Sequence, residues 1–173
     1  MSTADNNISK AGLTPLAGGD QAKTDLLQML QGSQFFGDFP VPQIETLTQY
    51  VQAYSGTAGT EIFREGDRGG FMCLLIAGAA EIFKQDNKYG SKRIGRIGPG
   101  ITVGEMALVD GEQRSATCIC PEPSTLVMLT REQFVRIIRE HPALSVNILL
   151  KIVTMMSRRL RQASGQLVDY LQD

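Results

Sequence analysis

The residues from Gly104 to Arg114 have the types and the spacing of a site for a phosphate joined to a sugar. Gly104 lets the backbone approach a ligand closely, and the small Ala107 lies in a short turn whose N–H groups can face an anion. Arg114 supplies a planar, permanently charged guanidinium for phosphate oxygens. Glu105, which only accepts hydrogen bonds when ionised, suits a sugar hydroxyl. Together these residues predict a nucleotide ligand.

Residues 103–117 resemble the phosphate-binding cassette of the cyclic nucleotide-binding domain family. That family includes catabolite-activator-type bacterial regulators, the regulatory subunits of protein kinase A, and cyclic-nucleotide-gated channels. The resemblance implies that Arg114 holds the cyclic phosphate and that Glu105 receives the ribose 2′-hydroxyl. Val103 and Gln113 depart from the aromatic residue and the proline that are common at these positions, and neither change removes a ligand-contacting group.

Both charged residues also have ordinary structural interpretations. Arg114 could be a surface strand residue in an ion pair, and Glu105 could be a carboxylate favoured by a helix dipole. Because Gly104 and Ala107 stand at the family spacing beside them, the ligand-binding interpretation is favoured.

The residues that contact the base are less sharply defined by the sequence. Ser115 can place its hydroxyl on the phosphate, and in the family a hydroxyl here is found with cGMP and with cAMP, so it leaves the base open. Candidates for the base are Thr117, at the end of the cassette, and Arg159 and Ser164, on the segment that resembles the family's C-helix. Counting from the Arg-Arg-Leu motif favours Ser164, and counting from His141 favours Arg159.

Composition is that of one ordinary domain of 173 residues, 42% of them hydrophobic. Lys plus Arg number 17 and Asp plus Glu 18, so the formal charge of −1 gives no global nucleic-acid footprint. The longest apolar run, residues 71–80, is too short to span a bilayer, and the N-terminus lacks the features of a signal peptide. We therefore expect a cytoplasmic protein without membrane contact.

Three cysteines, Cys73, Cys118 and Cys120, lie in apolar, strand-like surroundings and have no metal-ligand spacing with the single histidine, His141. We interpret them as buried reduced thiols, and we expect no metal and no cofactor.

The organisation predicted along the chain has a flexible tail over residues 1–22 and a cyclic nucleotide-binding domain over residues 23–173. Within it we expect a helical lead-in over residues 23–56, with one helix from Asp25 and another over residues 42–54. Turn residues recur between short β-like runs over residues 57–130 and predict a β-jelly-roll barrel, hence an α+β fold. Six strands are expected there, at residues 61–64, 72–76, 79–84, 92–97, 116–120 and 125–129.

After the barrel, Thr130 and Gln133 form a capping box that predicts a helix, and His141-Pro142 ends it. A long helix then follows to the end of the domain at residue 172. Its apolar stripe has two interpretations, packing onto the barrel and homodimerisation through residues 143–171, and we keep both. The stripe contains Leu144, Ile148, Ile152, Met155, Leu160, Leu167 and Leu171. The arginines at 158, 159 and 161 are interpreted as a solvated face rather than a nucleic-acid patch.

The sequence thus predicts a non-catalytic receptor for a cyclic mononucleotide, cAMP first and cGMP second, that signals to an unknown effector protein through its C-terminal helix. No nucleophile with a base supports an enzyme. Direct DNA binding is not expected, since the chain ends at Asp173 before a helix-turn-helix could follow. Two alternatives stay open. One is a truncated or partner-dependent transcription regulator, or the regulatory domain of an enzyme or channel. The other is an interaction module that has lost its pocket or takes a cyclic dinucleotide.

Overall fold

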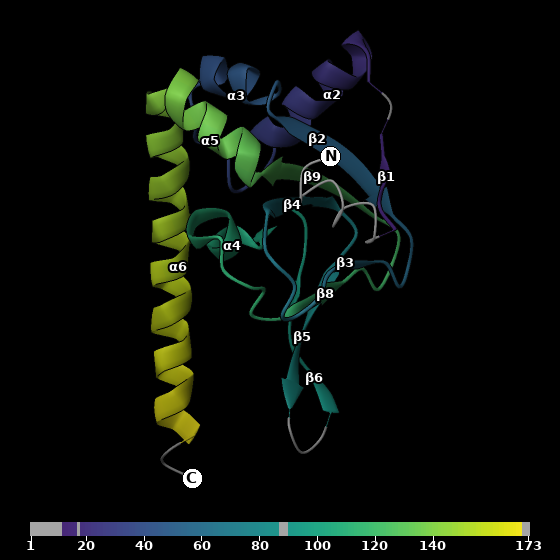
Figure 1. Ribbon diagram of the computed structural model, residues 1–173, viewed down its shortest axis with the longest axis vertical. Coiled ribbons are helices and arrows are strands. Elements are labelled where there is room, and N and C mark those ends of the chain that lie inside the picture. Colours follow the sequence, from purple (N-terminus) through teal and green to yellow (C-terminus); the bar gives the residue numbers. More distant parts are fainter. Residues whose placement is uncertain (1–11, 17, 87–89, 171–173) are drawn as a thin grey trace.

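The core of the molecule consists of two antiparallel β-sheets that face each other, as the jelly-roll prediction requires, although they do not close into a barrel (Figure 1). The computed structural model describes residues 12–16, 18–86 and 90–170, so residues 1–11 of the predicted tail lie outside it. In spatial order, one sheet contains β1 (Thr14–Pro15), β2 (Val51–Gly56), β9 (Ser124–Thr130), β4 (Phe71–Ala77) and β7 (Thr102–Val103), and the other contains β3 (Glu61–Phe63), β8 (Thr117–Ile119), β5 (Ala80–Asp86) and β6 (Gly90–Ile97).

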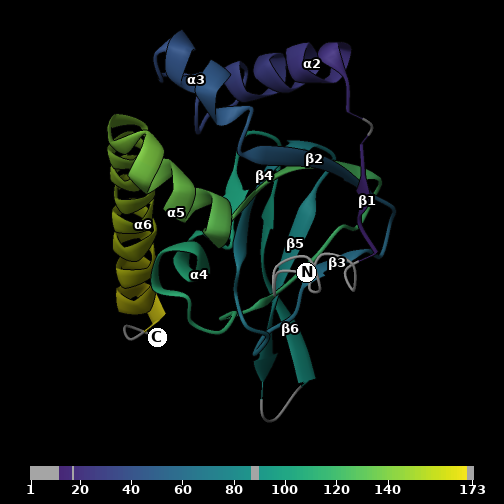
Figure 2. The same ribbon diagram turned by 45° about the horizontal axis from the view of Figure 1, so that its top comes forward.

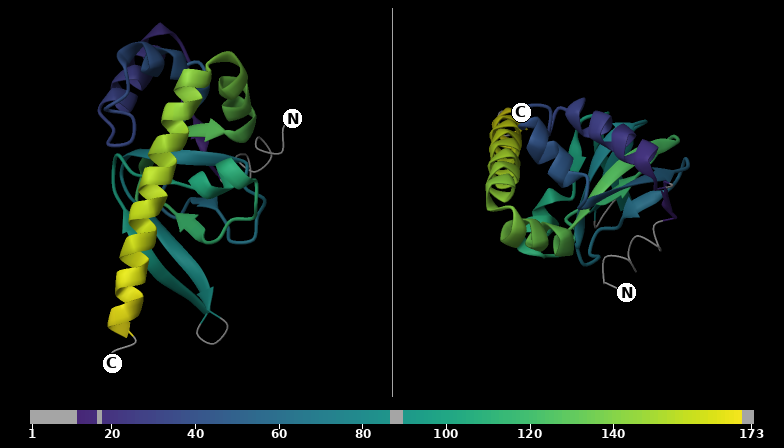
Figure 3. Two further views of the ribbon diagram at one scale, coloured as in Figure 1. Left: turned by 90° about the vertical axis from the view of Figure 1, so that its left-hand side faces the viewer. Right: turned by 90° about the horizontal axis from the view of Figure 1, so that it is seen from above.

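Helices cover one end and one side of the sheets (Figure 2). Two of them, α2 (Asp20–Gln31) and α3 (Val41–Leu47), form the lead-in, and α5 (Arg131–Glu140) packs beside α6 (Pro142–Tyr170). The short helix α4 (Glu105–Asp110) lies between the sheets and α6. Seen from the side in Figure 3, α6 runs along nearly the whole length of the molecule. It is therefore the element that can connect the cassette to the lead-in.

Two hydrophobic clusters hold these layers together. One lies between the two sheets and includes Phe71, Cys73 and Leu126. The other joins the lead-in helices to the outer face of the first sheet and to α5 and α6, with Leu30 and Ile148 fully buried in it. Alternate residues of the central strands contribute to different clusters, which is the two-residue period expected of a strand with both faces covered.

The predicted helix over residues 42–54 was wrong in its second half. Helix α3 ends at Leu47, and β2 begins at Val51 and pairs with β9 over its whole length. Val51 and Ala53 pack against the cluster that contains Leu30, whereas Tyr54 packs between the sheets. The sequence of this segment also fits a helix. It forms a strand because its side chains pack alternately against the two clusters.

The predicted tail was too long at its C-terminal end. Leu13 is buried between the sheets, and β1 pairs with β2 at Ser55 and Tyr54. Helix α2 begins at Asp20, five residues before the predicted start. A tail of Gly, Pro and polar residues gives no periodicity, so only the burial of Leu13 reveals that this segment belongs to the fold.

The capping box after the sheets is present, since the Thr130 hydroxyl accepts a hydrogen bond from the backbone N–H of Gln133. Helix α5 ends before His141, and Pro142 occupies the first turn of α6, where its missing N–H costs nothing. Leu144, Ile148 and Ile152 are buried, which confirms that the first half of the stripe packs onto the domain.

Farther along α6 the stripe leaves the domain, because Leu160 is 69% exposed. The predicted stripe residue Leu171 and the side chain of Leu167 lie outside the described part of the chain. None of the helices in the described ranges has the length and apolarity needed to cross a membrane.

The turn that precedes β4 fixes the position of α4. A Cβ added to Gly69 would lie only 2.0 Å from the Cβ of Ala107, so this glycine and this alanine allow α4 to pack directly on the turn. Gly69→Ala should therefore displace α4 and destabilise the protein by about 1–3 kcal/mol. Denaturant unfolding measures this change.

Gly98→Ala is the matched control, since a Cβ at Gly98 meets no described atom within 4 Å. Its effect should stay within about 0.5 kcal/mol. Equal stability of the two variants would contradict the close packing of Gly69 on Ala107.

Candidate nucleotide site

Helix α4 is held at both ends by glycines in the left-handed conformation, Gly104 (φ 77°) and Gly111 (φ 73°). At Gly104 a second constraint is steric, because a Cβ there would lie 2.4 Å from Nη1 of Arg114. Only glycine combines this conformation with so close an approach. The first N–H groups of α4 have no partner within the helix, as at every helix start.

Arg114 is the central charge of the site and is only 4% exposed. Its Nη2 donates to the carbonyl oxygen of Phe71 at 2.7 Å, and its Nη1 donates to the carbonyl oxygen of Gly104 at 3.1 Å. The guanidinium lies 4.2 Å from the ring centroid of Phe63 and 4.5 Å from that of Phe71, within the range of cation–π attraction. No carboxylate of the described residues forms an ion pair with it.

Glu105 is 3% exposed, and its two oxygens are in different situations. Oε1 accepts a hydrogen bond from Nη1 of Arg159, which reaches over from α6. Oε2 is fully buried and has no hydrogen-bond partner. A buried carboxylate oxygen without a donor is costly, so a further donor at this position would stabilise the site.

Arg159 connects three elements. Besides Glu105 on α4, its Nη2 donates to the carbonyl oxygen of Thr102 on β7 at 2.9 Å. The sequence singled out Arg159 as a candidate for the base, and the structure places its guanidinium on the carboxylate predicted to hold the ribose.

Burial opposes the charge on both central groups. Burial raises the pKa of the Glu105 carboxyl, whereas the nearby guanidinium groups of Arg159 and Arg114 lower it. Burial also lowers the pKa of Arg114, an effect that nearby charges such as Glu105 counteract. The net pKa of Glu105 is raised and that of Arg114 is lowered, so burial outweighs the opposing charges at both groups, and those charges only limit the two shifts.

These residues line a cavity of about 360 Å³ between α4, β5, β6 and α6. One wall is polar and contains Gly104, Glu105, Ala107, Arg114, Ser115 and Arg159. The apolar part of the lining, called the apolar wall below, contains Phe63, Ile82, Ile94, Ile97 and Val103. A cavity lined by both charged and apolar groups suits a ligand that carries both kinds of group.

The structure brings together five of the predicted phosphate and ribose residues. Ser115, although exposed, lines the same cavity as Arg114, Glu105, Gly104 and Ala107. Thr117 and Ser164 do not line it. The Thr117 hydroxyl accepts a hydrogen bond from the backbone N–H of Glu65, and that of Ser164 donates to the carbonyl of Leu160 in its own helix.

Sequence reasoning missed the apolar wall and the two phenyl rings around Arg114. Ile82 and Ile94 belong to a hairpin whose half-buried and exposed positions give no clear two-residue period. Phe63 and Phe71 are ordinary strand residues in the sequence, and only the fold places their rings against one guanidinium. The exposed Ile94 was the one available signal, because an apolar side chain on an edge hairpin lacks a core to pack into.

The three cysteines are buried and free, as predicted. Burial raises the pKa of Cys73 to about 12 and also raises the pKa values of Cys118 and Cys120. Their thiols are therefore un-ionised at neutral pH. Within the described ranges no group of three or more His, Cys, Asp or Glu residues is arranged to hold a metal ion.

Comparison with known proteins agrees with the site. Residues 55–141 match the family model for the cyclic nucleotide-binding domain. The chain is 29% identical over 138 residues to the cyclic AMP receptor protein of Thermus thermophilus, covering 80% of this chain and 62% of that relative. It is 30% identical to the cAMP-dependent protein kinase regulatory subunit of Yarrowia lipolytica, covering 60% of this chain and 26% of the relative. The chain thus spans less than two thirds of either curated relative.

Among solved structures, the crystal structure of a cyclic nucleotide-binding domain from Methylobacillus flagellatus superposes with a TM-score of 0.78 at 26% identity. The match covers 91% of this chain and 88% of that one, so it includes the sheets and the helices that position the cassette. With the family model matching half of the sequence, the chain belongs to the cyclic nucleotide-binding domain family.

Proposed function

We propose that the protein is a receptor for a cyclic mononucleotide, cAMP first and cGMP second. The observation that carries this proposal is a buried arginine without a carboxylate partner beside a buried carboxylate with one unpaired oxygen. A ligand that carries both an anion and a hydroxyl, as a nucleotide does, could pair its anion with Arg114 and its hydroxyl with Glu105.

The phosphate would be bound by Arg114 and by backbone N–H groups at the start of α4. Two of the five guanidinium N–H donors are used by main-chain carbonyls, which leaves three for phosphate oxygens. Because the guanidinium is already held by two rings and two carbonyls, little side-chain entropy remains to be lost on binding. Ser115 lies at the edge of the cavity, where its hydroxyl can add a contact to the phosphate.

The ribose 2′-hydroxyl would donate to Oε2 of Glu105, since Oε1 already accepts from Arg159. Binding would thus satisfy the unpaired oxygen without breaking the contact to α6. The purine would then lie toward the apolar wall formed by Ile82 and Ile97. The named activities of the relatives, a cyclic AMP receptor and a cAMP-dependent kinase subunit, support cAMP as the first ligand.

Signalling would pass through α6, which contacts α4, β7 and the lead-in. Arg159 ties α6 to Glu105, and Met155 contacts the Thr102 hydroxyl. Nearer its start, Lys151 and Asn147 bind the lead-in at Asp38 and Gln43. A ligand that stabilises Glu105 in its charged form therefore favours the docked position of α6, and an effector that reads this position is biased by the ligand.

The role proposed for this receptor is regulatory and non-catalytic, in the cytoplasm. Support comes from the kinds of protein that it resembles, namely a cyclic AMP receptor and regulatory subunits of a kinase. The effector would be a separate protein or a further part of a longer chain.

We also propose that α6 pairs with α6 of a second copy. Four apolar residues on its outer face, between 51% and 69% exposed, follow the alternating four- and three-residue steps of a coiled-coil seam: Val146, Leu150, Val153 and Leu160. Ser157 completes the seam between the last two. The buried stripe occupies a different face, so packing onto the domain and dimerisation are compatible.

Removing the guanidinium of Arg114 should weaken cAMP binding by at least about tenfold, because a charge-assisted contact in a buried site is lost. Calorimetric titration of Arg114→Ala measures this loss. Arg96→Ala is the matched control, since Arg96 is exposed and outside the cavity. Wild-type affinity in a folded Arg114→Ala variant would contradict the phosphate assignment.

Removing Arg159 should weaken cAMP binding about tenfold at neutral pH and make the affinity more sensitive to acid. Without Arg159 the already raised pKa of Glu105 rises further, so the carboxylate takes up a proton at higher pH and becomes a weaker acceptor. Titrations of Arg159→Ala and wild type across about pH 5–8 measure this difference.

The folding stability of Arg159→Ala should depend on pH in the opposite sense from its cAMP affinity, falling as the pH rises. A carboxyl whose folded pKa lies above its unfolded value stabilises the fold less as pH rises through that interval, so Arg159→Ala should lose stability relative to wild type above pH 4.5. Glu105→Gln in the same background should abolish the extra pH dependence. If the stability of Arg159→Ala and of wild type varied with pH in parallel, the proposed effect of Arg159 on the Glu105 carboxyl would be contradicted.

Placing a charge in the α6 seam should separate the dimer. Val153→Glu should give a monomer in sedimentation equilibrium, because two buried like charges would face each other. Val41→Glu on α3, a similarly exposed position, is the control and should leave the dimer intact. A monomeric wild type, or a dimer that survives Val153→Glu, would refute the pairing of α6.

A further inference from the structure

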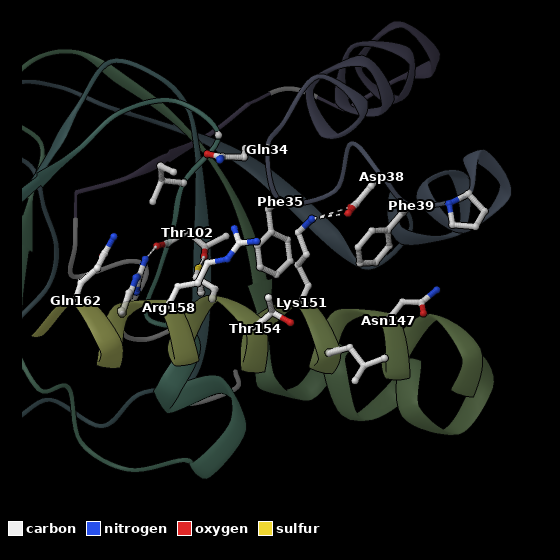
Figure 4. Close-up of a pocket in the computed structure, with 16 residues that line it drawn as sticks. Gln34, Phe35, Asp38, Phe39, Thr102, Asn147, Lys151, Thr154, Arg158 and Gln162 are labelled. Atoms are coloured by element: carbon white, nitrogen blue, oxygen red, sulfur yellow. Dashed lines mark hydrogen bonds and ion pairs between the residues drawn. The ribbon is translucent and has the colours of Figure 1, made fainter. Parts of the chain in front are cut away.

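A second and larger cavity, of about 680 Å³, lies on the other side of Arg159 from the nucleotide cavity. It is a groove between α6 and two segments that face it, residues 34–40 of the lead-in and residues 100–102 before and in β7. Figure 4 shows side chains from α6 and from the lead-in loop pointing toward one another across this groove. Its α6 wall runs from residue 147 to residue 162, or about 22 Å at 1.5 Å per residue.

The chemistry of the groove changes along its length. Toward Asn147 the walls include Phe39 and the exposed Pro40 of the lead-in, beside the ion pair of Lys151 and Asp38. Toward Gln162 the wall becomes cationic, with Arg158 and Arg159 adjacent on α6. The groove thus combines an apolar end with a positive end.

Positive charge in this groove is only partly neutralised by the protein. Lys151 pairs with Asp38 at 2.7 Å, and Arg159 pairs with Glu105, which lies outside the groove. Arg158 points into the groove and makes no ion pair or hydrogen bond with any residue in the described ranges. Three cations therefore face a single acid, Asp38, among the lining residues.

We propose that this groove binds an acidic segment of the effector protein, with an apolar side chain at the Phe39 end and carboxylates at Arg158 and Arg159. Charge complementarity selects an acidic partner, and the apolar end selects a peptide over a simple polyanion. The groove is long enough for about 15 helical residues. This proposal rests on the proposed receptor function, since it names the surface through which that receptor contacts its effector.

Arg159 makes the two cavities interdependent, because it lines both of them. A peptide carboxylate that draws this guanidinium into the groove removes it from Glu105 and from the Thr102 carbonyl. Glu105 then loses its counter-ion, which favours the protonated carboxyl, a weaker acceptor for the ribose hydroxyl. Peptide and nucleotide consequently oppose each other, and by linkage each weakens the other by the same factor.

The test uses the whole protein and a fluorescein-labelled synthetic peptide of about 15 residues with Glu and Leu at helical spacing. Fluorescence anisotropy should show saturable binding of this peptide, and none of a peptide with Lys at every Glu position. Arg158→Glu should weaken peptide binding by at least about tenfold through charge reversal. Saturating cAMP should weaken binding to the wild type, and Arg159→Ala should abolish that effect.

A separate cAMP titration of Arg158→Glu keeps the two proposals distinguishable. Unchanged cAMP affinity is expected, because Arg158 does not line the nucleotide cavity. If cAMP binds and the peptide binds Arg158→Glu within about twofold of wild type, the groove proposal is overturned while the receptor stands. Binding of inorganic tripolyphosphate without binding of the peptide overturns the peptide as its occupant.

Discussion

The structure depends on one interaction, the burial of the Arg114 guanidinium between two phenyl rings and two main-chain carbonyls without a carboxylate partner. A buried charge without a counter-ion is costly, so surrounding features are shaped to hold it. Gly104 has no side chain because the guanidinium occupies that space, and Gly69 lets α4 pack on the turn through Ala107. The fold thus maintains a buried cation that forms no ion pair with a carboxylate of the described residues.

Glu105 extends this constraint from the cassette to the rest of the molecule. Burial raises the pKa of its carboxyl, and Arg159, which belongs to α6 and also binds β7, limits that rise. Because α6 also binds the lead-in at Asp38 and Gln43, a single helix links this carboxylate to the lead-in. The nucleotide cavity and the larger groove lie on either side of this single arginine.

What could be predicted from sequence was what is local. The cassette is readable because glycine and charge requirements fall within eleven residues, and the six central strands are marked by turns. Strand β2 was mistaken for a helix because its alternation is set by two packing partners far away in sequence. Ser164 was a reasonable candidate for the base, yet helix phase alone could not reveal that Arg159 would meet Glu105. The apolar wall is assembled from the β5–β6 hairpin and from β3 and β7, so no single stretch of sequence contains its pattern.

Calorimetric titration of the purified protein with cAMP, with cGMP and cyclic di-GMP alongside, tests the central claim most directly. If Arg114 and Glu105 form a receptor site, one cyclic mononucleotide binds saturably with micromolar or tighter affinity. Absence of binding by both mononucleotides would contradict the account, and binding of cyclic di-GMP alone would show that the cavity takes a different ligand.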